Sequence, residues 1–529
     1  MATSFTSLLD LASRAGLLDP RRVTALGVAT SRWGPTLAAP VAASALRAPS
    51  ATAVVDQRGR LTNAELEHRS TRLAKGFHAI GVGRGRRLGV LCRNHRDFVE
   101  VTVAAAKASL EVVYLNTGSA APQVLDIARR EELDAIVVDE ALRDLVDDAF
   151  DGPVVVADLP SGRRGPVHGP HDLDLATVRG RAGWRPLLAS RPVAPVLLTS
   201  GTTGTPKGAR RSVGRPGLSS STAVLQEIPY RADDVVGIAS PLFHAWGLAQ
   251  LGLALVLGAP VAVTTTFIPA ATLRQIEEEE VTVLAVVPAI LQRLLASPAL
   301  DDADLSTLRV VASSGSALPV PVVTSWLDRV GPNLFNLYGS TEVGQATIAN
   351  PSELLEHPST AGHALPGSVV RILDEAGEEL PDGELGRIFV GNDAQFDGYT
   401  GGGGKEVVGD VMSTGDVGYL DGGLLFVTGR SDDMIVSGGE NVFPAEIEDL
   451  LLAHPDVDDV AVVGVDDDDF GQRLAAHVVL VEGSDLGADD VRRLVGEHLA
   501  RHKVPRDVHL VDELPRTTTG KIRRGQLRG

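Results

Sequence analysis

Short apolar runs alternate with amphipathic helical patterns along most of the chain, and this alternation constrains the fold more than any other feature. An apolar run at residues 88–92 precedes a helical pattern at 98–108, and a second apolar run follows at 112–115. Strand, helix and strand in this order are typical of layered α/β folds. Further runs of strand length occupy residues 135–138, 154–156, 193–198, 235–239, 281–287 and 308–312. The sequence therefore predicts an α/β fold with a large, multi-layered N-terminal body.

The pattern changes in the second half of the chain. From Val369 onwards the apolar runs become shorter and turn pairs such as Asp382-Gly383 separate them, which indicates a β-rich subdomain. After about Arg430 the order is helix, strand, strand and helix, at residues 444–453, 460–465, 475–481 and 489–501. We therefore expect two domains, a body at residues 1–429 and a small α+β domain at residues 430–529.

The charge balance limits the classes of partner. The chain has 529 residues with 49 basic and 68 acidic side chains, which gives a formal charge of −19. Nucleic acids and anionic membranes bind basic surfaces, so neither is expected as a partner. The chain has one cysteine, Cys92, so it cannot form an intrachain disulfide, and this fits the reducing cytoplasm where we expect the protein. Cys92 lies in an apolar run and is interpreted as a buried thiol. The sequence leaves open whether the protein forms a homodimer.

One segment has the length and composition of a membrane span. Residues 245–273 contain no charged side chain. Gly258 and Pro260 interrupt this stretch, so we interpret it as a buried helix at about residues 246–257 and a buried strand at about residues 260–266. No stable membrane insertion is expected.

The N-terminal 22 residues are also apolar in part. They have no basic n-region, and Asp10 interrupts the apolar stretch. These features differ from those of a signal peptide. The segment is therefore predicted to form one amphipathic helix.

A loop rich in glycine and hydroxyl side chains follows the apolar run at 193–198. It reads Thr199-Ser200-Gly201-Thr202-Thr203-Gly204-Thr205-Pro206-Lys207-Gly208. Glycines allow the backbone to approach an anion closely, and hydroxyl and N–H groups donate hydrogen bonds to phosphate oxygens. The spacing differs from that of the GxxxxGK[ST] loop. A flexible connector is the alternative, but the length and the Lys-Gly ending favour a phosphate-binding loop.

Further segments place polar side chains on turns. The segment Asn336-Leu337-Tyr338-Gly339-Ser340-Thr341-Glu342 puts a carboxylate beside hydroxyl groups, an arrangement suited to Mg²⁺ on a phosphate. The segment Ser413-Thr414-Gly415-Asp416 offers a carboxylate to a ribose diol. Two more segments, at residues 429–441 and 515–522, contain Arg430, Asp432, Gly438, Gly439 and Lys521. Each segment alone is equally compatible with an ordinary turn.

Together and in this order, these segments resemble those of the adenylate-forming superfamily of acyl-CoA synthetases, firefly-type luciferases and peptide-synthetase adenylation domains. The resemblance extends from about Asp56 to the C-terminus. It is strongest to bacterial fatty-acyl-CoA synthetases, at Gly208-Ala209-Arg210-Arg211 and at Ser437-Gly438-Gly439-Glu440-Asn441-Val442-Phe443-Pro444. It implies that a carboxylic acid reacts with ATP to form an acyl-adenylate, and that CoA then accepts the acyl group.

The resemblance also implies a role for each residue. The loop from Thr199 to Lys207 would hold the β- and γ-phosphates of ATP. Thr341 and Glu342 would contact the α-phosphate and Mg²⁺. The nucleotide would also be lined by Gly315, Ser316, Ala317, Tyr338, Gly339, Asp416 and Arg430. The small domain would be mobile, with a hinge at Asp432, Lys521 in the first step, and Gly438 and Gly439 along the CoA channel in the second. The candidate catalytic residues are Lys521, Glu342, Thr199 and His244.

The acid is constrained by the segment Pro241-Leu242-Phe243-His244-Ala245-Trp246-Gly247, which matches the acyl-pocket gate of CoA ligases. His244 would orient the carboxylate, although a buried core histidine is the alternative. Amino-acid-activating relatives tend to have Asp here, so the Phe-His pair argues against an amino acid. Trp246, Gly344 and Gln345 would complete the pocket. An amide at Gln345 fits an alkyl chain poorly, which argues against a purely aliphatic acid and favours an aromatic or hydroxylated one. The sequence leaves both a fatty acid and an aryl acid open.

The acceptor is less constrained than the adenylation step. CoA is the expected acceptor. The alternative is an adenylate-forming enzyme with another acceptor, such as one that activates nitrite with ATP to diazotise an amino-aryl acid. Both kinds of enzyme share the ATP-binding segments, so those segments do not separate them.

Overall fold

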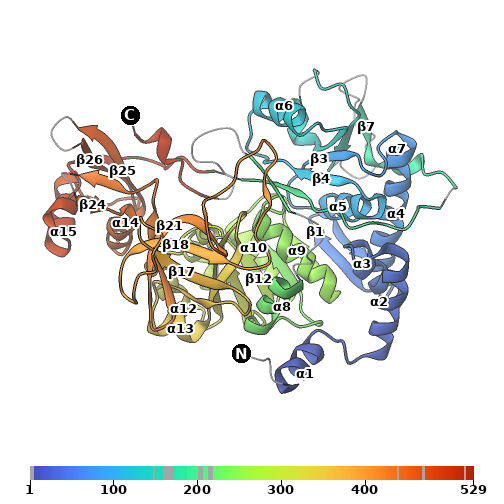
Figure 1. Cartoon of the computed structure of the whole chain (residues 1–529), viewed down its shortest axis with the longest axis horizontal. Coiled ribbons are helices and arrows are strands. Elements are labelled where there is room, and N and C mark those ends of the chain that lie inside the picture. Colours follow the sequence, from blue (N-terminus) through green and yellow to red (C-terminus); the bar gives the residue numbers. More distant parts are fainter. Residues whose placement is uncertain are drawn as a thin grey trace. The chain divides into compact units, whose positions relative to one another are not determined.

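The computed structural model describes residues 5–146, 149–158, 172–184, 186–199, 207–211, 218–437, 440–467, 471–517 and 520–528. The chain divides into two compact units. Figure 1 draws their helices and strands, coloured along the sequence. The first comprises Met1–Val286, Ala296–Ala312 and Asp393–Gly404, and the second comprises Val287–Leu295, Ser313–Asn392 and Lys405–Gly529. Helices and strands alternate in both units, so the predicted α/β fold class is confirmed.

A largely parallel sheet forms one half of the first unit, with the strand order β19-β9-β8-β4-β3-β5-β6-β7. Its strands are β3 (Arg87–Leu91), β4 (Glu111–Tyr114), β5 (Ala135–Asp139), β6 (Val154–Ala157), β7 (Asp172–Asp174), β8 (Val196–Leu198), β9 (Gly208–Arg210) and β19 (Gly398–Tyr399). β3 pairs in parallel with β4 and with β5. Helix α5 (Arg96–Ala108) connects β3 to β4, so the predicted strand–helix–strand unit is confirmed.

Helices packed near this sheet begin where local signals predict. Thr62 and Glu65 form a capping box at the start of α4 (Asn63–Ala79), in which each side chain accepts a hydrogen bond from the other residue's backbone N–H. Helix α4 contacts both α5 and α7 (Leu175–Gly180). The other helices here are α6 (Ala121–Arg130) and the 3₁₀ turn η1 (Glu140–Leu145).

A second set of strands in this unit has the order β13-β12-β10-β11-β1-β2. Their bounds are β1 (Thr52–Asp56), β2 (Gly59–Thr62), β10 (Val236–Ile238), β11 (Val261–Val263), β12 (Val283–Val286) and β13 (Val310–Ser313). The accompanying helices are α3 (Ala38–Arg47), α8 (Leu218–Glu227), α9 (Ala245–Leu257), α10 (Pro269–Glu278) and the turn η2 (Pro298–Leu300).

The uncharged stretch at 245–273 forms the predicted helix and strand, α9 and β11, followed by the start of α10. Gly258 ends α9 in the left-handed conformation, with a φ of 62°. Within the described residues, no helix combines the length and the apolar character that crossing a membrane requires.

The prediction of one helix over the first 22 residues is wrong. The structure has two helices, α1 (Phe5–Arg14) and α2 (Pro20–Trp33). Gly16 adopts a φ of 67° between them, a conformation that does not continue a right-handed helix. Asp19 caps α2 by accepting a hydrogen bond from the Arg21 N–H, and Pro20 occupies the first helical position.

The second unit contains antiparallel strands in the order β17-β18-β21-β22-β16-β15-β14, with β20 on β21. The strands are β14 (Leu334–Ser340), β15 (Gly344–Ala349), β16 (Thr360–Ala364), β17 (Val369–Leu373), β18 (Gly386–Gly391), β20 (Val407–Val408), β21 (Val411–Asp421) and β22 (Leu424–Arg430). The helices are α11 (Pro288–Leu295), α12 (Val320–Arg329) and α13 (Pro351–Glu356). The β-rich character predicted from Val369 onwards is confirmed.

The C-terminal part of this unit forms the predicted small α+β layer around its own apolar core. Its strands have the order β24-β23-β26-β25, with β27 on β26. They are β23 (Ile435–Ser437), β24 (Glu440–Val442), β25 (Val457–Asp467), β26 (Gly471–Leu480) and β27 (Asp507–Leu510), with α14 (Pro444–Leu452), α15 (Ala488–His498), η3 (Arg501–Lys503) and η4 (Arg524–Gln526). The predicted helix–strand–strand–helix order is confirmed, and the domain boundary at 430 stays a prediction.

Candidate active site

Three of the predicted nucleotide-binding residues meet on neighbouring strands of the second unit. Asp416 on β21 lies opposite Arg430 on β22 in the register of the pair. The Tyr338 hydroxyl, on β14, donates a hydrogen bond of 2.6 Å to Asp416 Oδ2. Arg430 Nη1 lies 3.5 Å from Asp416 Oδ1. The structure therefore brings together a carboxylate, a phenol and a guanidinium that are far apart in the sequence.

The surroundings of Asp416 affect its protonation in opposing ways. Burial raises the pKa of this carboxyl group, whereas the hydrogen bond from Tyr338 and the charge of Arg430 act to lower it, and the net pKa is raised. Burial and the adjacent carboxylate raise the pKa of Tyr338 well above its usual value. Tyr338 therefore stays protonated at neutral pH and acts as a hydrogen-bond donor.

Asp432, the predicted hinge residue, also contacts this group. Its Oδ1 accepts a hydrogen bond of 2.8 Å from Arg430 Nε. Burial acts to lower the pKa of Arg430, but Asp432 and Asp416 more than offset it, and the net pKa is raised. Arg430 thus links the candidate ribose-binding carboxylate to the candidate hinge.

Lys521, the candidate catalytic lysine, lies in the same electrostatic environment. Burial of its ammonium group and the charge of Arg430 lower the pKa of Lys521, whereas Asp416 and Glu342 act to raise it. The Lys521 residue as a whole is nevertheless exposed. The backbone turn around it is closed by two bonds, from Thr517 N to Lys521 O at 2.7 Å and from Lys521 N to Thr517 Oγ1 at 3.1 Å.

Glu342, the candidate metal ligand, lies on the turn between β14 and β15. Its backbone N–H donates to Ser340 Oγ at 3.2 Å, as does the N–H of Val343. The neighbouring Gly339 has a steric reason to be glycine, because a Cβ there would lie 2.1 Å from the Gly344 carbonyl oxygen. The tight turn therefore fixes the backbone that presents Thr341 and Glu342.

Lys405 is a cationic member of this group that sequence reasoning missed. Its charge acts to lower the pKa of Asp416. A Cβ added to Gly415 would lie 3.2 Å from both Lys405 Nζ and Arg430 Nη2, so both cations approach the same glycine. The sequence signal was weak, since Lys405 follows the Gly401–Gly404 run without any recognisable motif.

For the other predicted residues of this unit, none of the contacts described above connects them to Asp416, Arg430 or Lys521. Gly315, Ser316 and Ala317 follow β13 as an exposed stretch, and Gly315 has a φ of 99°. Gln345 is half-buried at the start of β15, and its carbonyl oxygen accepts a hydrogen bond from Asn392 Nδ2 at 3.2 Å. Gly438 and Gly439 lie outside the described residues.

The first unit holds the remaining candidates. Thr199 N donates to the Lys207 carbonyl oxygen at 2.8 Å, so the two ends of the predicted phosphate loop are closed against each other. Lys207 Nζ lies 5.2 Å from the ring centroid of Tyr399, within cation–π range. Ser200, Gly201, Thr202, Thr203 and Gly204 lie outside the described residues.

The predicted acid-binding segment is buried or half-buried in this unit. His244 is the N-cap residue of α9, and its ring centroid lies 4.5 Å from that of Phe243. Trp246 is buried and donates from Nε1 to the Val286 carbonyl oxygen at 2.9 Å. The buried hydrogen bond therefore holds the Trp246 ring in place, whereas His244 is half-buried and lies near Phe243.

Comparison with known proteins identifies the family. The sequence matches the family model described as AMP-binding enzyme over residues 41–400, and the model described as AMP-binding enzyme C-terminal domain over residues 446–521. The chain belongs to the AMP-binding enzyme family. The predicted membership of the adenylate-forming superfamily is thereby confirmed.

Similar members of the AMP-binding enzyme family are CoA ligases by name. The feruloyl-CoA synthase of an Amycolatopsis species is 34% identical over 497 residues, which are 91% of this chain and 96% of the relative. The indoleacetate–CoA ligase of Aromatoleum aromaticum is 33% identical over 502 residues, with coverage of 91% and 95%. The solved structure of ATP-bound MatB from Rhodopseudomonas palustris superposes with a TM-score of 0.82 at 29% identity, covering 93% of this chain and 98% of that one.

The two family matches leave a gap that contains much of the site. Lys521 is the last residue of the C-terminal match, and Tyr338 lies within the N-terminal match. Asp416, Arg430 and Asp432 lie between them, in the segment where the hydrogen bonds above are made. The roles of all these residues stay predictions.

Proposed function

We propose that this protein activates an aromatic carboxylic acid with ATP and transfers the acyl group to CoA. The main prediction of the sequence, an AMP-forming acid–CoA ligase, is confirmed by the relatives, which match nearly the whole chain. The observation that carries the assignment of roles is the convergence of Arg430, Lys405 and Lys521 around Asp416. This arrangement suits a nucleotide, because it offers a carboxylate to the ribose and cationic groups to the phosphates.

The first step places negative charge on the leaving group. A carboxylate oxygen of the acid attacks the α-phosphorus of ATP, and the bond from this phosphorus to the pyrophosphate oxygen breaks. Lys521 would donate to the oxygens between acid and phosphate, and Thr341 would contact the α-phosphate. Mg²⁺, held by Glu342, would supply further charge neutralisation. Loss of one such oriented donor typically costs about 10²–10³ in rate.

The second step returns the nucleotide as AMP. The thiolate of CoA attacks the acyl carbon, the carbon–oxygen bond to the phosphate breaks, and AMP leaves with that oxygen. We propose that residues 430–529 rotate about Asp432 between the steps, so that Gly438 and Gly439 replace Lys521 at the reacting atoms. A hinge of this kind concentrates the backbone change in a few residues.

The aromatic character of the acid is supported by two independent observations. Feruloyl and indoleacetate, the groups in the names of two relatives, both contain aromatic rings. Gln345 is half-buried, and an amide there is better satisfied by a polar ring substituent than by an alkyl chain. His244 would orient the carboxylate, and Trp246 and Gly344 would line the ring.

A panel of acids tests the reaction. Pyrophosphate release is measured with hydroxylated aryl acids, unsubstituted aryl acids and fatty acids, each with and without CoA, and the products are identified by mass spectrometry. We expect acyl-CoA and AMP with an aryl acid. Release with fatty acids alone would refute the aromatic assignment, and turnover of an amino-aryl acid with nitrite but not CoA would favour diazotisation.

The proposed role of Lys521 is tested by its replacement. Lys521→Ala should nearly abolish pyrophosphate release yet spare thioester formation from a supplied acyl-adenylate, because the lysine acts in the first step. Lys503→Ala is the matched control, since Lys503 is a lysine of the same C-terminal segment that pairs with Glu446. Equal loss of both steps in Lys521→Ala would contradict the alternation between steps.

A further inference from the structure

The proposed acid-binding segment is fastened to the β3–α5 loop by one buried amide. Asn94 is 6% exposed. Its Nδ2 donates to the carbonyl oxygens of Ile238, at 3.3 Å, and Ser240, at 2.9 Å. Its Oδ1 accepts from the Leu242 N–H at 2.8 Å. Asn94 therefore makes three hydrogen bonds to the backbone that leads from β10 into the segment 241–247.

The position of this backbone determines where His244 lies. The His244 N–H donates to the Pro241 carbonyl oxygen at 3.3 Å. A Cβ on Gly247 would lie 2.3 Å from the same Pro241 oxygen, so the first turn of α9 packs directly on that peptide. A shift at Pro241 and Leu242 would therefore move both the His244 backbone and the start of the helix that holds Trp246.

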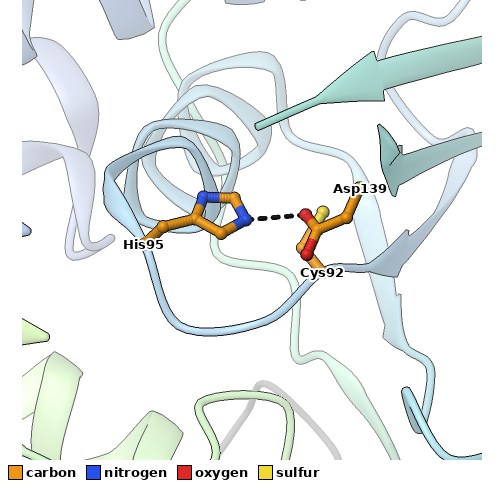
Figure 2. Close-up of side chains that lie close together, drawn as sticks. All are labelled: Cys92, His95 and Asp139. Carbon is orange, nitrogen blue, oxygen red and sulfur yellow. Dashed lines mark hydrogen bonds and ion pairs between the residues drawn. The ribbon is translucent and has the colours of Figure 1, made fainter. Parts of the chain in front are cut away.

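The β3–α5 loop, which contains Asn94, is itself held by contacts with the end of the neighbouring strand β5. Figure 2 shows His95 and Cys92 close to Asp139, at the end of β5. His95 Nε2 lies 2.6 Å from Asp139 Oδ1. Asp139 Oδ2 accepts from Arg93 N at 3.0 Å and from Arg93 Nε at 2.9 Å. The residues on both sides of Asn94 are thus bound to one buried carboxylate.

The protonation of His95 follows from its second contact. Asp97 N donates to His95 Nδ1 at 3.2 Å, so in the neutral ring Nε2 carries the proton that is donated to Asp139. His95 is 1% exposed and Asp139 is fully buried. The pair is therefore a fixed donor and acceptor that orient the loop.

Cys92, His95 and Asp139 also have the residue types of a metal site, and their ligand atoms lie within 4.8 Å of one another. Their contacts argue for a structural brace instead. Both carboxylate oxygens and both ring nitrogens already make hydrogen bonds. Burial and Asp139 raise the pKa of the Cys92 thiol well above its usual value, whereas a metal requires the thiolate.

We propose that Asn94 is a positioning residue for the acid-binding segment, held in place by Arg93, His95 and Asp139. This inference rests on the proposed function, because it assumes that His244 and Trp246 contact the acid. The proposal predicts an effect on the acid but not on the nucleotide site. Loss of the Asn94 bonds displaces the acid relative to ATP, while the Asp416 group in the other unit is untouched.

Asn94→Asp tests the proposal with a side chain of the same shape. The carboxylate can still accept from the Leu242 N–H, but it cannot donate to the Ile238 and Ser240 carbonyl oxygens and repels them. We expect kcat/KM for the acid to fall by about 10- to 100-fold, since small misplacements of a reacting group have effects of this order. The KM for ATP should stay at the wild-type value.

Thr102→Val is the matched control. Thr102 is buried on α5, the helix that follows Asn94, and its hydroxyl bonds to Tyr114 OH at 3.0 Å. This variant removes one buried hydrogen bond of the same unit without touching the segment 241–247. It should therefore leave kcat/KM for the acid unchanged.

Hydrogen exchange measured by mass spectrometry gives a readout that does not depend on turnover. Peptides covering residues 238–247 should exchange faster in Asn94→Asp than in the wild type or in Thr102→Val. If Asn94→Asp does not fold, Asp139→Asn, which loosens the brace from outside the loop, should show the same change in the same peptides.

The outcomes separate the two proposals. Unchanged exchange at 238–247, or a KM for ATP that rises as much as the KM for the acid in a folded variant, would overturn the role of Asn94. A wild-type protein that releases no pyrophosphate with any acid would overturn the proposed function instead, and the exchange measurement would still decide whether Asn94 holds the segment.

Discussion

Replacement of Tyr338 by phenylalanine isolates the hydrogen bond that holds Asp416. The Tyr338 hydroxyl lies 2.6 Å from Asp416 Oδ2, and the Asp416 side chain keeps only 15% of its surface exposed. A hydrogen bond to a charged group contributes about 1.5–3 kcal/mol, so its loss corresponds to about 10- to 150-fold in an equilibrium constant. Because Asp416 is partly exposed and water can replace the phenol, the lower end applies. We expect the KM for ATP to rise about tenfold.

The pH profile supplies a second signature of the same change. The Tyr338 bond acts to lower the pKa of Asp416, which burial raises. Without this donor the pKa of Asp416 rises further, so the carboxylate becomes protonated at a higher pH. The acidic limb of kcat/KM for ATP should therefore move to higher pH in Tyr338→Phe.

Tyr230→Phe is the matched control for this experiment. The Tyr230 hydroxyl donates to Gln250 Oε1 at 2.7 Å, in the first unit, and the side chain is fully buried. Its loss should lower the free energy of unfolding by about 1 kcal/mol while the kinetics with ATP stay unchanged. An unaltered KM for ATP in Tyr338→Phe, or an equal rise in Tyr230→Phe, would refute the assignment of Tyr338 to the nucleotide site.

Two further predictions concern stability. Burial and the charge of Glu448 raise the pKa of Asp449 to about 7, although the Val320 N–H donates to it. A pKa that is raised in the folded state costs stability once the pH exceeds the unfolded value, so Asp449→Asn should stabilise the protein by about 1–3 kcal/mol at pH 8 and by less at pH 5, measured by thermal unfolding. An equal gain at both values would contradict this. For Asp139, burial acts to raise the pKa, but the hydrogen bonds from His95 and Arg93 outweigh it and the pKa is lowered to about 2. This carboxylate should contribute about 2 kcal/mol above pH 4 that is lost as the pH falls towards 2, and Asp139→Asn should flatten that acid slope in urea unfolding.

Local signals explain which parts of the fold could be predicted. The start of α4 is encoded by Thr62 and Glu65 alone, and the end of α9 by Gly258, so both were predictable from short windows. The break between α1 and α2 was not predicted, although Gly16 and Pro20 lie between or at the ends of these helices. Glycine and proline each also occur at the ends of single helices. The left-handed φ of Gly16, which ends the first helix, is not visible in the sequence.

The sequence names candidate residues for the site one by one, but not the contacts between them. Asp416 and Arg430 are brought opposite each other by the register of β21 and β22, which includes a bulge that the sequence does not reveal. Lys405 reaches the same group from a loop without periodicity. Asn94 lies in an unremarkable sequence, and its importance appears only where three backbone groups of a distant segment converge on it.

The net charge of −19 and the proposed anionic substrates are compatible because electrostatic attraction is local. At physiological ionic strength the screening length is about 8 Å, so distant surface carboxylates contribute little at a partly buried site. Arg430, Lys405 and Lys521 converge near two carboxylates, Asp416 and Glu342, within the second unit. With Asp432, which pairs with Arg430, three cationic groups face three carboxylates, so bound Mg²⁺ would supply the excess positive charge. The acidic remainder of the surface then repels polyanions such as nucleic acids, while a small nucleotide that fits the group is bound.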